Sequence, residues 1–177
     1  MKKIFLMSFA LLVIFTCSAF AAKEPPTTLG IVIIGGSEFK TADYYKMIPK
    51  VFDFKKNITC KIGDEMQSRY QKFLLEYDLV GNDTPKKQNL IDFAARSGCN
   101  KILFLVVDSS ADHQNDFKSK QKNRLTVQTD AYLCDGLQVI DVQTTTQESD
   151  SKASDLRARR EAFKKTLTEL AKAIKTF

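Results

Sequence analysis

The residues of this chain that could do chemistry are small and acidic ones, placed where predicted strands end. They are Gly35, Gly36 and Ser37 after residues 29–34, Asp64 after residues 57–62, and Asp108 and His113 after residues 101–107. If these strands are parallel, their carboxyl ends share one edge of a sheet, which is where open α/β sheets bind ligands. Backbone amides after Gly36 could hold an anion there, or the carboxylates could hold a hard cation such as Mg²⁺.

A plainer interpretation of the same residues is favoured. Turn glycines, a helix cap at Asp64 and a solvated loop after residue 107 explain all of them. The Gly-Gly-Ser segment has neither the G-x-G-x-x-G spacing of dinucleotide-binding loops nor a following Gly-Lys-Ser/Thr. His113 is the only histidine, so a zinc site would lack a second imidazole, and no nucleophile motif accompanies it. We therefore predict no catalytic residue, no metal and no cofactor; a small secreted enzyme acting near Asp108 and His113 is the alternative.

A second group of residues is basic and alternates strictly along the chain. Lys118, Lys120, Lys122 and Arg124 would share one face of a strand. That face could bind an anionic surface such as lipid headgroups, lipopolysaccharide or nucleic acid. Nucleic acid is disfavoured because no aromatic residue interleaves with these side chains to stack on bases. The favoured interpretation is that they protect an edge strand from pairing with another chain.

The element that must position these residues is the apolar run 101–107. A short run without polar alternation predicts a strand covered on both faces, which requires helices on both sides of a sheet. Together with the run 29–34 and a helix ending before Gly98, it predicts parallel strands joined by a right-handed crossover. We predict a single α/β domain over residues 29–177. Its mixed five-stranded sheet has three parallel strands plus a C-terminal β-hairpin, with helices packed on its faces.

Local signals predict where the other elements begin and end. Helices are expected from Thr41 to about Phe52 with a kink or stop at Pro49, from a cap at Asp64, from Thr84-Pro85 to Ser97, and along the C-terminus with Leu156 on its apolar side. Polar connections are expected over residues 108–116 and 147–151, and a two-residue hairpin turn at Asp135-Gly136.

The first 21 residues have the pattern of a cleaved export signal. Two lysines precede an apolar segment that is too short to span a bilayer comfortably, and Ala19-Phe20-Ala21 supplies the small residues that the signal peptidase needs. Cys17 makes a lipid anchor a minor alternative, but Thr16 stands where a lipoprotein signal has Gly, Ala or Ser. We predict a short leader over residues 22–28 and an exported protein, periplasmic or secreted.

Charge and cysteine content narrow the class of protein further. Loss of Lys2 and Lys3 with the signal lowers the formal charge from +6 to +4, which is not typical of a dedicated nucleic-acid binder. No second apolar segment of membrane length follows the signal. Cys60, Cys99 and Cys134 lack C-x-x-C spacing. Export permits one disulfide, but three small buried apolar residues are favoured.

The order of these segments resembles a small α/β domain of bacterial envelope proteins. The resemblance is carried by the first strand Ile31-Val32-Ile33-Ile34, by Gly98-Cys99-Asn100 before the strand 102–106, by Asp141-Val142-Gln143-Thr144-Thr145 in the hairpin, and by a long C-terminal helix. The families are the TolB-type amino-terminal domain, the curli-secretion lipoproteins and the penicillin-binding-protein activators. In them the passage before the strand often reads Gly-Ala-Asp and the hairpin often reads Asp-Val-x-Thr-Gly, so the matches at residues 98–100 and 141–145 are partial. The resemblance implies a non-catalytic module that binds other envelope proteins or supports assembly. It carries over no binding residue.

The residues and the resemblance together predict a non-catalytic exported envelope protein. We expect it to act as a binding or assembly module for other envelope components, with an envelope protein as its partner. An anionic surface bound through Lys118 to Arg124 is the alternative partner, and nucleic acid is not expected.

Overall fold

The computed structural model describes residues 26–80, 85–112, 123–151 and 154–174 of the 177-residue chain. The strands are β1 (Thr27–Gly35), β2 (Ile58–Lys61), β3 (Lys101–Asp112), β4 (Asn123–Cys134) and β5 (Val139–Ser151). The helices are α2 (Ala42–Phe52), α3 (Asp64–Glu76), α4 (Lys87–Arg96) and α5 (Asp155–Ala173), with a short 3₁₀ turn, η1 (Ser37–Phe39).

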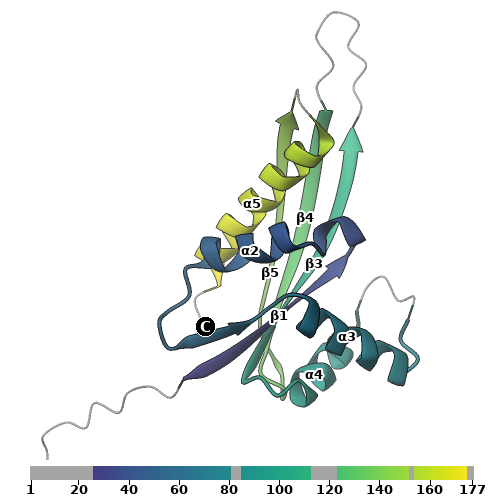
Figure 1. Cartoon of the computed structure of the whole chain (residues 1–177), viewed down its shortest axis with the longest axis vertical. Helices are drawn as coiled ribbons and strands as arrows, with labels where there is room; N and C mark the ends of the chain where they lie inside the picture. Colours follow the sequence, from purple (N-terminus) through teal and green to yellow (C-terminus); the bar gives the residue numbers. More distant parts are fainter. Residues whose placement is uncertain (1–25, 81–84, 113–122, 152–153, 175–177) are drawn as a thin grey trace, which may run out of the picture.

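The five strands form one mixed sheet in the order β2-β1-β3-β4-β5. β1 is parallel to both β2 and β3, whereas β3, β4 and β5 are successive antiparallel neighbours. This arrangement confirms the predicted fold class: a single α/β domain with three parallel strands and a C-terminal hairpin. The described helices pack against the sheet on two sides (Figure 1).

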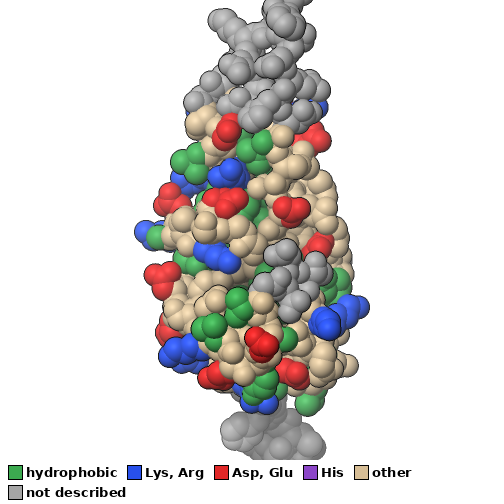
Figure 2. All heavy atoms as spheres, turned by 90° about the vertical axis from the view of Figure 1, so that its right-hand side faces the viewer, with side chains coloured by type: hydrophobic (Ala, Val, Ile, Leu, Met, Phe, Trp, Pro, Cys, Tyr) green, Lys and Arg blue, Asp and Glu red, His purple; other side chains and the backbone are tan. Residues whose placement is uncertain are grey.

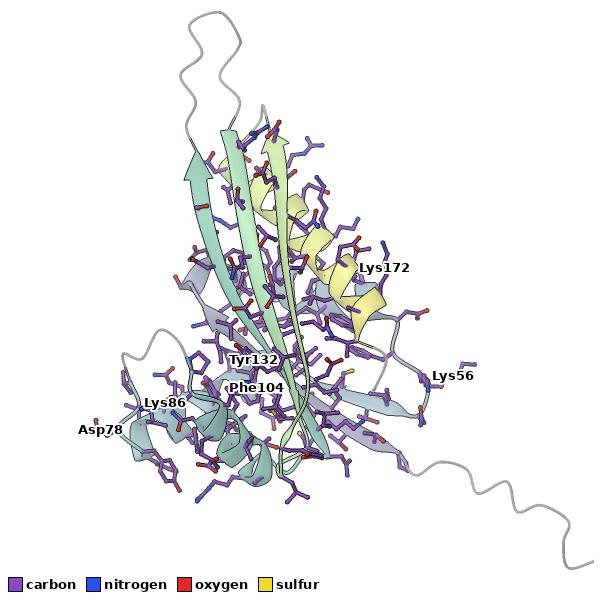
Figure 3. The ribbon with its side chains drawn as sticks, turned by 180° about the vertical axis from the view of Figure 1, so that it is seen from behind. Lys56, Asp78, Lys86, Phe104, Tyr132 and Lys172 are labelled. Carbon is purple, nitrogen blue, oxygen red and sulfur yellow. The ribbon has the colours of Figure 1, made fainter. Side chains whose placement is uncertain are left out.

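Alternate residues of the central strands belong to two separate cores. On one face, Leu103 and Leu105 of β3 pack with α2 and α5. On the other face, Ile102 and Phe104 pack with α3 and α4. All four side chains are fully buried, as expected for a strand covered on both faces. Figure 3 shows that α3 and α4 cover only the lower part of the second face, at the level of Phe104 and Tyr132.

The run 101–107 is followed by more strand, so the polar loop predicted from residue 108 is wrong for residues 108–112. β3 continues to Asp112 and pairs with residues 124–128 of β4. These residues are polar because α3 and α4 no longer cover this end of the sheet, not because the strand ends. The polar connection predicted over residues 147–151 is also wrong. Residues 147–151 belong to β5, which continues to Ser151.

The hairpin between β4 and β5 turns differently from the prediction. Cys134 pairs with Val139, so the loop has four residues, Asp135 to Gln138, and the two-residue turn at Asp135-Gly136 is wrong. The Asp135 carboxylate accepts hydrogen bonds from the backbone N–H groups of Leu137 and Gln138, both at 2.9 Å. These bonds lower the pKa of Asp135 and stabilise the longer loop.

Three helix details also differ from the sequence interpretation. Pro49 lies in the last turn of α2 without stopping it, because the helix still closes with the Asp53 N–H donating to the Pro49 carbonyl at 3.2 Å. Asp64 is the first helical residue of α3, not its cap, since Gly63 takes that position. Leu156 is 61% exposed, because Ala158 supplies the buried contact at this end of α5. α4 begins at Lys87, and Thr84 lies outside the described residues.

The three cysteines that follow the signal are free thiols in this structure. Burial raises the pKa of the Cys134 thiol to about 12 and also raises that of Cys60. Cys134 is buried as predicted, whereas Cys60 and Cys99 are only partly buried, so the prediction of three buried cysteines is wrong for these two. A protonated thiol is a weak nucleophile. In the part of the chain that the structure describes, no helix has the length and apolar character needed to cross a membrane.

Gly30 in β1 lets α3 approach the sheet. A Cβ atom at this position would collide with Cδ1 of Ile102 and lie 2.8 Å from Cε of Met66, which is fully buried on α3. Gly30 is paired directly with Ile102 in the sheet. A side chain here therefore forces the ends of the buried Ile102 and Met66 side chains to shift within the core between α3 and the sheet.

We expect Gly30→Ala to lower the free energy of unfolding by roughly 1–3 kcal/mol through overpacking, measured by urea denaturation. Ile102→Val removes the Cδ1 atom that the new methyl group meets. The double variant should therefore lose less stability than the sum of the two single losses. Strict additivity of the two losses would contradict this account of Gly30.

Candidate functional site

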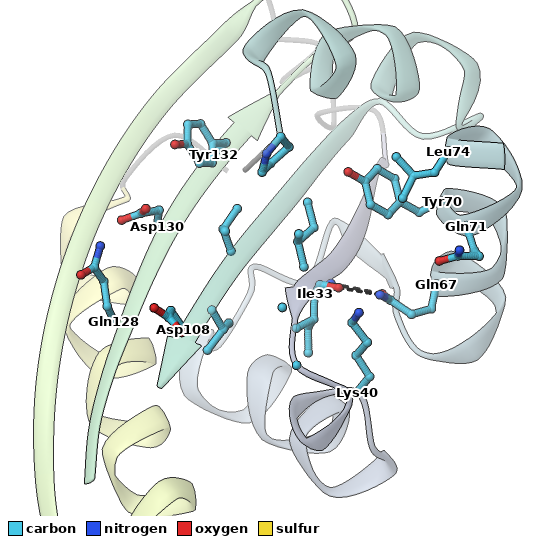
Figure 4. A pocket seen from close by; sticks show the side chains of 16 residues that line it. Ile33, Lys40, Gln67, Tyr70, Gln71, Leu74, Asp108, Gln128, Asp130 and Tyr132 are labelled. Carbon is cyan, nitrogen blue, oxygen red and sulfur yellow. Dashed lines mark hydrogen bonds between the residues drawn. The ribbon is translucent and has the colours of Figure 1, made fainter. Parts of the chain in front are cut away.

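A polar pocket of about 750 Å³ lies between α3 and the open end of the sheet. Its walls come from the end of β1 and the turn after it, from α3, and from the middle of β3 and β4 (Figure 4). It occupies the place where α3 stops covering the sheet. On the side of the molecule seen in Figure 2, backbone and uncharged polar side chains predominate, with separate acidic, basic and hydrophobic side chains among them.

The α3 wall is fixed by one glutamine. β2 has only four residues and pairs with β1 only as far as Gly30, so the outer edge of β1 is unpaired beyond that residue. The Gln67 side chain takes the place of the missing strand. Its Oε1 accepts from the Ile33 N–H at 3.1 Å, and its Nε2 donates to the Ile33 carbonyl at 2.5 Å. A side-chain amide thus satisfies both backbone groups and holds α3 beside the pocket.

We expect Gln67→Ala to lower the free energy of unfolding by roughly 1–3 kcal/mol, because both polar groups of Ile33 lose their partner. Gln71→Ala is the matched control, since Gln71 lies one turn further along α3, lines the pocket and is exposed. Chemical denaturation of the two variants measures the difference. Equal losses would show that the Gln67 bonds do not stabilise the fold.

The sheet wall carries two carboxylates. Asp108 of β3 lies opposite Gln128, and Asp130 of β4 lies opposite Val106, so the two acids are diagonal neighbours on one face. Diagonal positions are separated by roughly 7–8 Å. Oδ1 of Asp108 accepts from the Ser109 N–H at 2.8 Å. Oδ1 of Asp130 is buried and has no hydrogen-bond partner among the described groups, which is costly for a carboxylate.

The opposite wall carries Lys40. Figure 4 shows the Lys40 side chain extending along the pocket toward the end of β1. The chain reaches this place through Gly35, whose φ of +140° and close approach to the Val107 carbonyl exclude a side chain. Phe39, which is 1% exposed, anchors the turn to the core directly before Lys40. The pocket therefore has a basic wall facing an acidic one.

Tyr70 of α3 lines the pocket with an aromatic ring. Its ring packs edge-on against Phe93 with centroids 5.0 Å apart, and it lies 5.8 Å from the ring of Phe104. Burial raises the pKa of Tyr70 to about 12. Burial and then the charge of Asp130 also raise the pKa of Tyr132, which lies next to the acidic wall.

The raised pKa of Tyr70 predicts a loss of stability at alkaline pH. An unfolded tyrosine releases its proton near pH 10, whereas folded Tyr70 keeps it to about pH 12, so the free energy of unfolding falls as pH rises through this window. Tyr70 accounts for roughly 3 kcal/mol of that fall over the whole window, and about half of this is reached by pH 11. In urea denaturation at pH 8 and pH 11, Tyr70→Phe should show a smaller fall than the wild type. The matched control is Tyr77→Phe at the exposed end of the same helix, and an unchanged pH dependence in Tyr70→Phe would contradict the prediction.

The structure brings together some of the residues singled out in the sequence. Gly35, Gly36 and Asp108 line the pocket. Ser37 begins η1 and Asp64 begins α3, and neither lines it. His113 lies outside the described residues, as do Lys118, Lys120 and Lys122.

Arg124 lies on β4, an interior strand of the sheet. The prediction that it protects an edge strand from pairing with another chain is therefore wrong. β4 is flanked by β3 and β5, and β5 is the edge strand of the sheet on that side. The Nε atom of Arg124 lies 3.4 Å from Oδ1 of Asp150 and 3.7 Å from Oε2 of Glu148, both on β5. The guanidinium group therefore pairs with two carboxylates on the sheet surface.

Sequence reasoning missed Lys40, Gln67 and Asp130. Asp130 had a usable signal, because the alternation through residues 125–133 places it on the polar side of a strand. Lys40 and Gln67 had none, since a lysine in a turn and a glutamine in a helix are ordinary surface residues. No cluster of three or more His, Cys, Asp or Glu side chains within the described ranges is arranged to hold a metal ion.

Comparison with known proteins yields a general likeness of fold at low similarity. Neither a known family nor a curated protein matches the sequence. Among solved structures, the hypothetical protein CT253 from Chlamydia trachomatis has a TM-score of 0.45 and 6% identity, over 82% of this chain and 95% of that one. A "putative lipoprotein" from Caulobacter crescentus CB15 has a TM-score of 0.35 and 9% identity, over 82% of each chain. A minor lipoprotein from Acinetobacter baumannii has a TM-score of 0.32 and 10% identity, over 84% and 88%. These values assign the chain to no family and carry no functional argument.

Proposed function

We propose that this chain is an exported, non-catalytic module of the bacterial envelope that binds a basic segment of a partner protein in the pocket between α3 and the sheet. The observation that carries the proposal is the acidic wall. Asp130 has a buried carboxylate oxygen without a hydrogen-bond partner among the described residues, and Asp108 lies diagonal to it on the same face. A buried acceptor of this kind requires a hydrogen-bond donor, and a cationic donor serves it best.

The chemistry of the pocket matches a lysine or arginine side chain. Its charged end would lie against Asp108 and Asp130, and its alkyl stem against Val106 and Ile34. Lys40 on the opposite wall would bind a carboxylate or backbone carbonyl of the same segment. A volume of about 750 Å³ accommodates a few residues and lies in the usual range of ligand pockets.

Two further features support a binding role in the envelope. The N-terminal 21 residues have the pattern of an export signal, which would place the domain outside the cytoplasm. Among the described residues that line the pocket there is no serine, cysteine or histidine to form a nucleophile–base pair.

The test is an affinity capture from a detergent-solubilised envelope fraction, using residues 22–177 as bait. The fold supports this bait, because every described helix and strand lies between Thr27 and Ala173. We expect a stoichiometric partner that the double variant Asp108→Asn/Asp130→Asn loses at least tenfold. The asparagines keep the shape of the pocket and remove its negative charge.

Asp64→Asn is the matched control for this experiment. Asp64 is an exposed carboxylate at the start of α3 that does not line the pocket, so the change should leave capture intact. Recovery of the same proteins by all three baits would contradict a role for the pocket. Repeated recovery of no partner by the wild type would contradict the binding module itself.

A further inference from the structure

A basic groove of about 800 Å³ lies between α2 and α5, on the side of the sheet opposite the acidic pocket. The two helices lie next to each other over the sheet in Figure 1. Lys46 and Lys50 of α2 line the groove together with Arg157, Arg160 and Lys164 of α5. The acidic residues in its lining are Asp43 and Glu161. Five positive charges face two negative ones.

The cations of this groove are mostly unpaired. Nη1 of Arg160 lies 3.4 Å from Oδ2 of Asp43, and both side chains are at least half exposed. The remaining four basic residues form no ion pair with any described carboxylate; they are Lys46, Lys50, Arg157 and Lys164. Their charges are therefore directed at solvent from both helices, which raises the local concentration of anions.

The groove also has an apolar component. Met47 and Val51, partly buried against the core, line it between the two rows of cations. Leu156 precedes Arg160 by one helical turn on α5 and is 61% exposed. Apolar side chains among unpaired cations match a ligand surface that is anionic and has apolar material directly beneath.

We propose that the α2–α5 face docks on an anionic phospholipid surface. Phosphodiester groups would pair with Lys46, Lys50, Arg157 and Lys164, while Leu156 and Met47 would reach the apolar layer below the headgroups. Charge complementarity selects this occupant. Nucleic acid fits less well, because none of the described residues that line the groove is aromatic and could stack on bases. This docking surface is independent of the acidic pocket and of the function proposed for it.

The test is co-sedimentation of residues 22–177 with vesicles of phosphatidylglycerol and phosphatidylcholine, compared with vesicles of phosphatidylcholine alone. We expect binding only to the anionic vesicles, weakening as salt is raised. Each cation near an anionic surface contributes roughly a fivefold factor to the partition coefficient. Lys50→Gln/Lys164→Gln should therefore lower the coefficient by about 25-fold.

The matched control is Lys72→Gln/Lys87→Gln, which removes the same charge from exposed positions on α3 and α4. It should reduce vesicle binding far less. A similar loss in both double variants, or equal binding to neutral vesicles, would overturn the proposal. So would full competition by millimolar inorganic phosphate or tighter binding of a DNA oligonucleotide. Asp108→Asn/Asp130→Asn should leave vesicle binding unchanged, so failure of the pocket and failure of this surface are distinguishable.

Discussion

The rest of the structure depends on burial of the central strand on both faces. Ile102, Leu103, Phe104 and Leu105 are fully buried, alternately under α3–α4 and under α2–α5. Each such side chain contributes about 1.5–3 kcal/mol when it leaves water. Loss of either helix layer would expose the two side chains on that face, so burial of all four requires both layers. The order of elements follows from this constraint, since a parallel pair needs a helical crossover to bring the chain back across the sheet.

The pocket arises where this double coverage ends. α3 and α4 are short, and beyond Val106 the second face of β3 and β4 meets solvent (Figure 3). From Asp108 onward polar side chains therefore occupy that face, while α5 still buries the other face through residues such as Leu125 and Val127. At the boundary, carboxylates on the sheet lie next to a helix that is attached to the edge of β1 by Gln67. The pocket forms between these two layers.

The architecture could be predicted from the sequence, because continuous apolar segments indicate which strands are buried. The run 101–107 is typical of a strand covered on both faces, and the order of the other predicted segments indicates the five-stranded mixed sheet that the structure has. The end of β3 was misjudged because loss of one helix layer and the end of a strand produce the same polar signal at Asp108. Gln67 could not be predicted, since its importance depends on β2 being too short to pair with Ile33, which is a tertiary fact.

The two candidate surfaces lie on opposite sides of one sheet, and this geometry makes them compatible. The basic groove belongs to the outer side of α2 and α5, whereas the acidic pocket opens between α3 and the far face of β3 and β4. Docking the groove on an anionic membrane would therefore turn the pocket toward the aqueous space, where a segment of a partner protein could enter. The opposite signs of charge would reinforce this orientation, because an anionic membrane would attract the lysine and arginine side chains of α2 and α5 and repel Asp108 and Asp130.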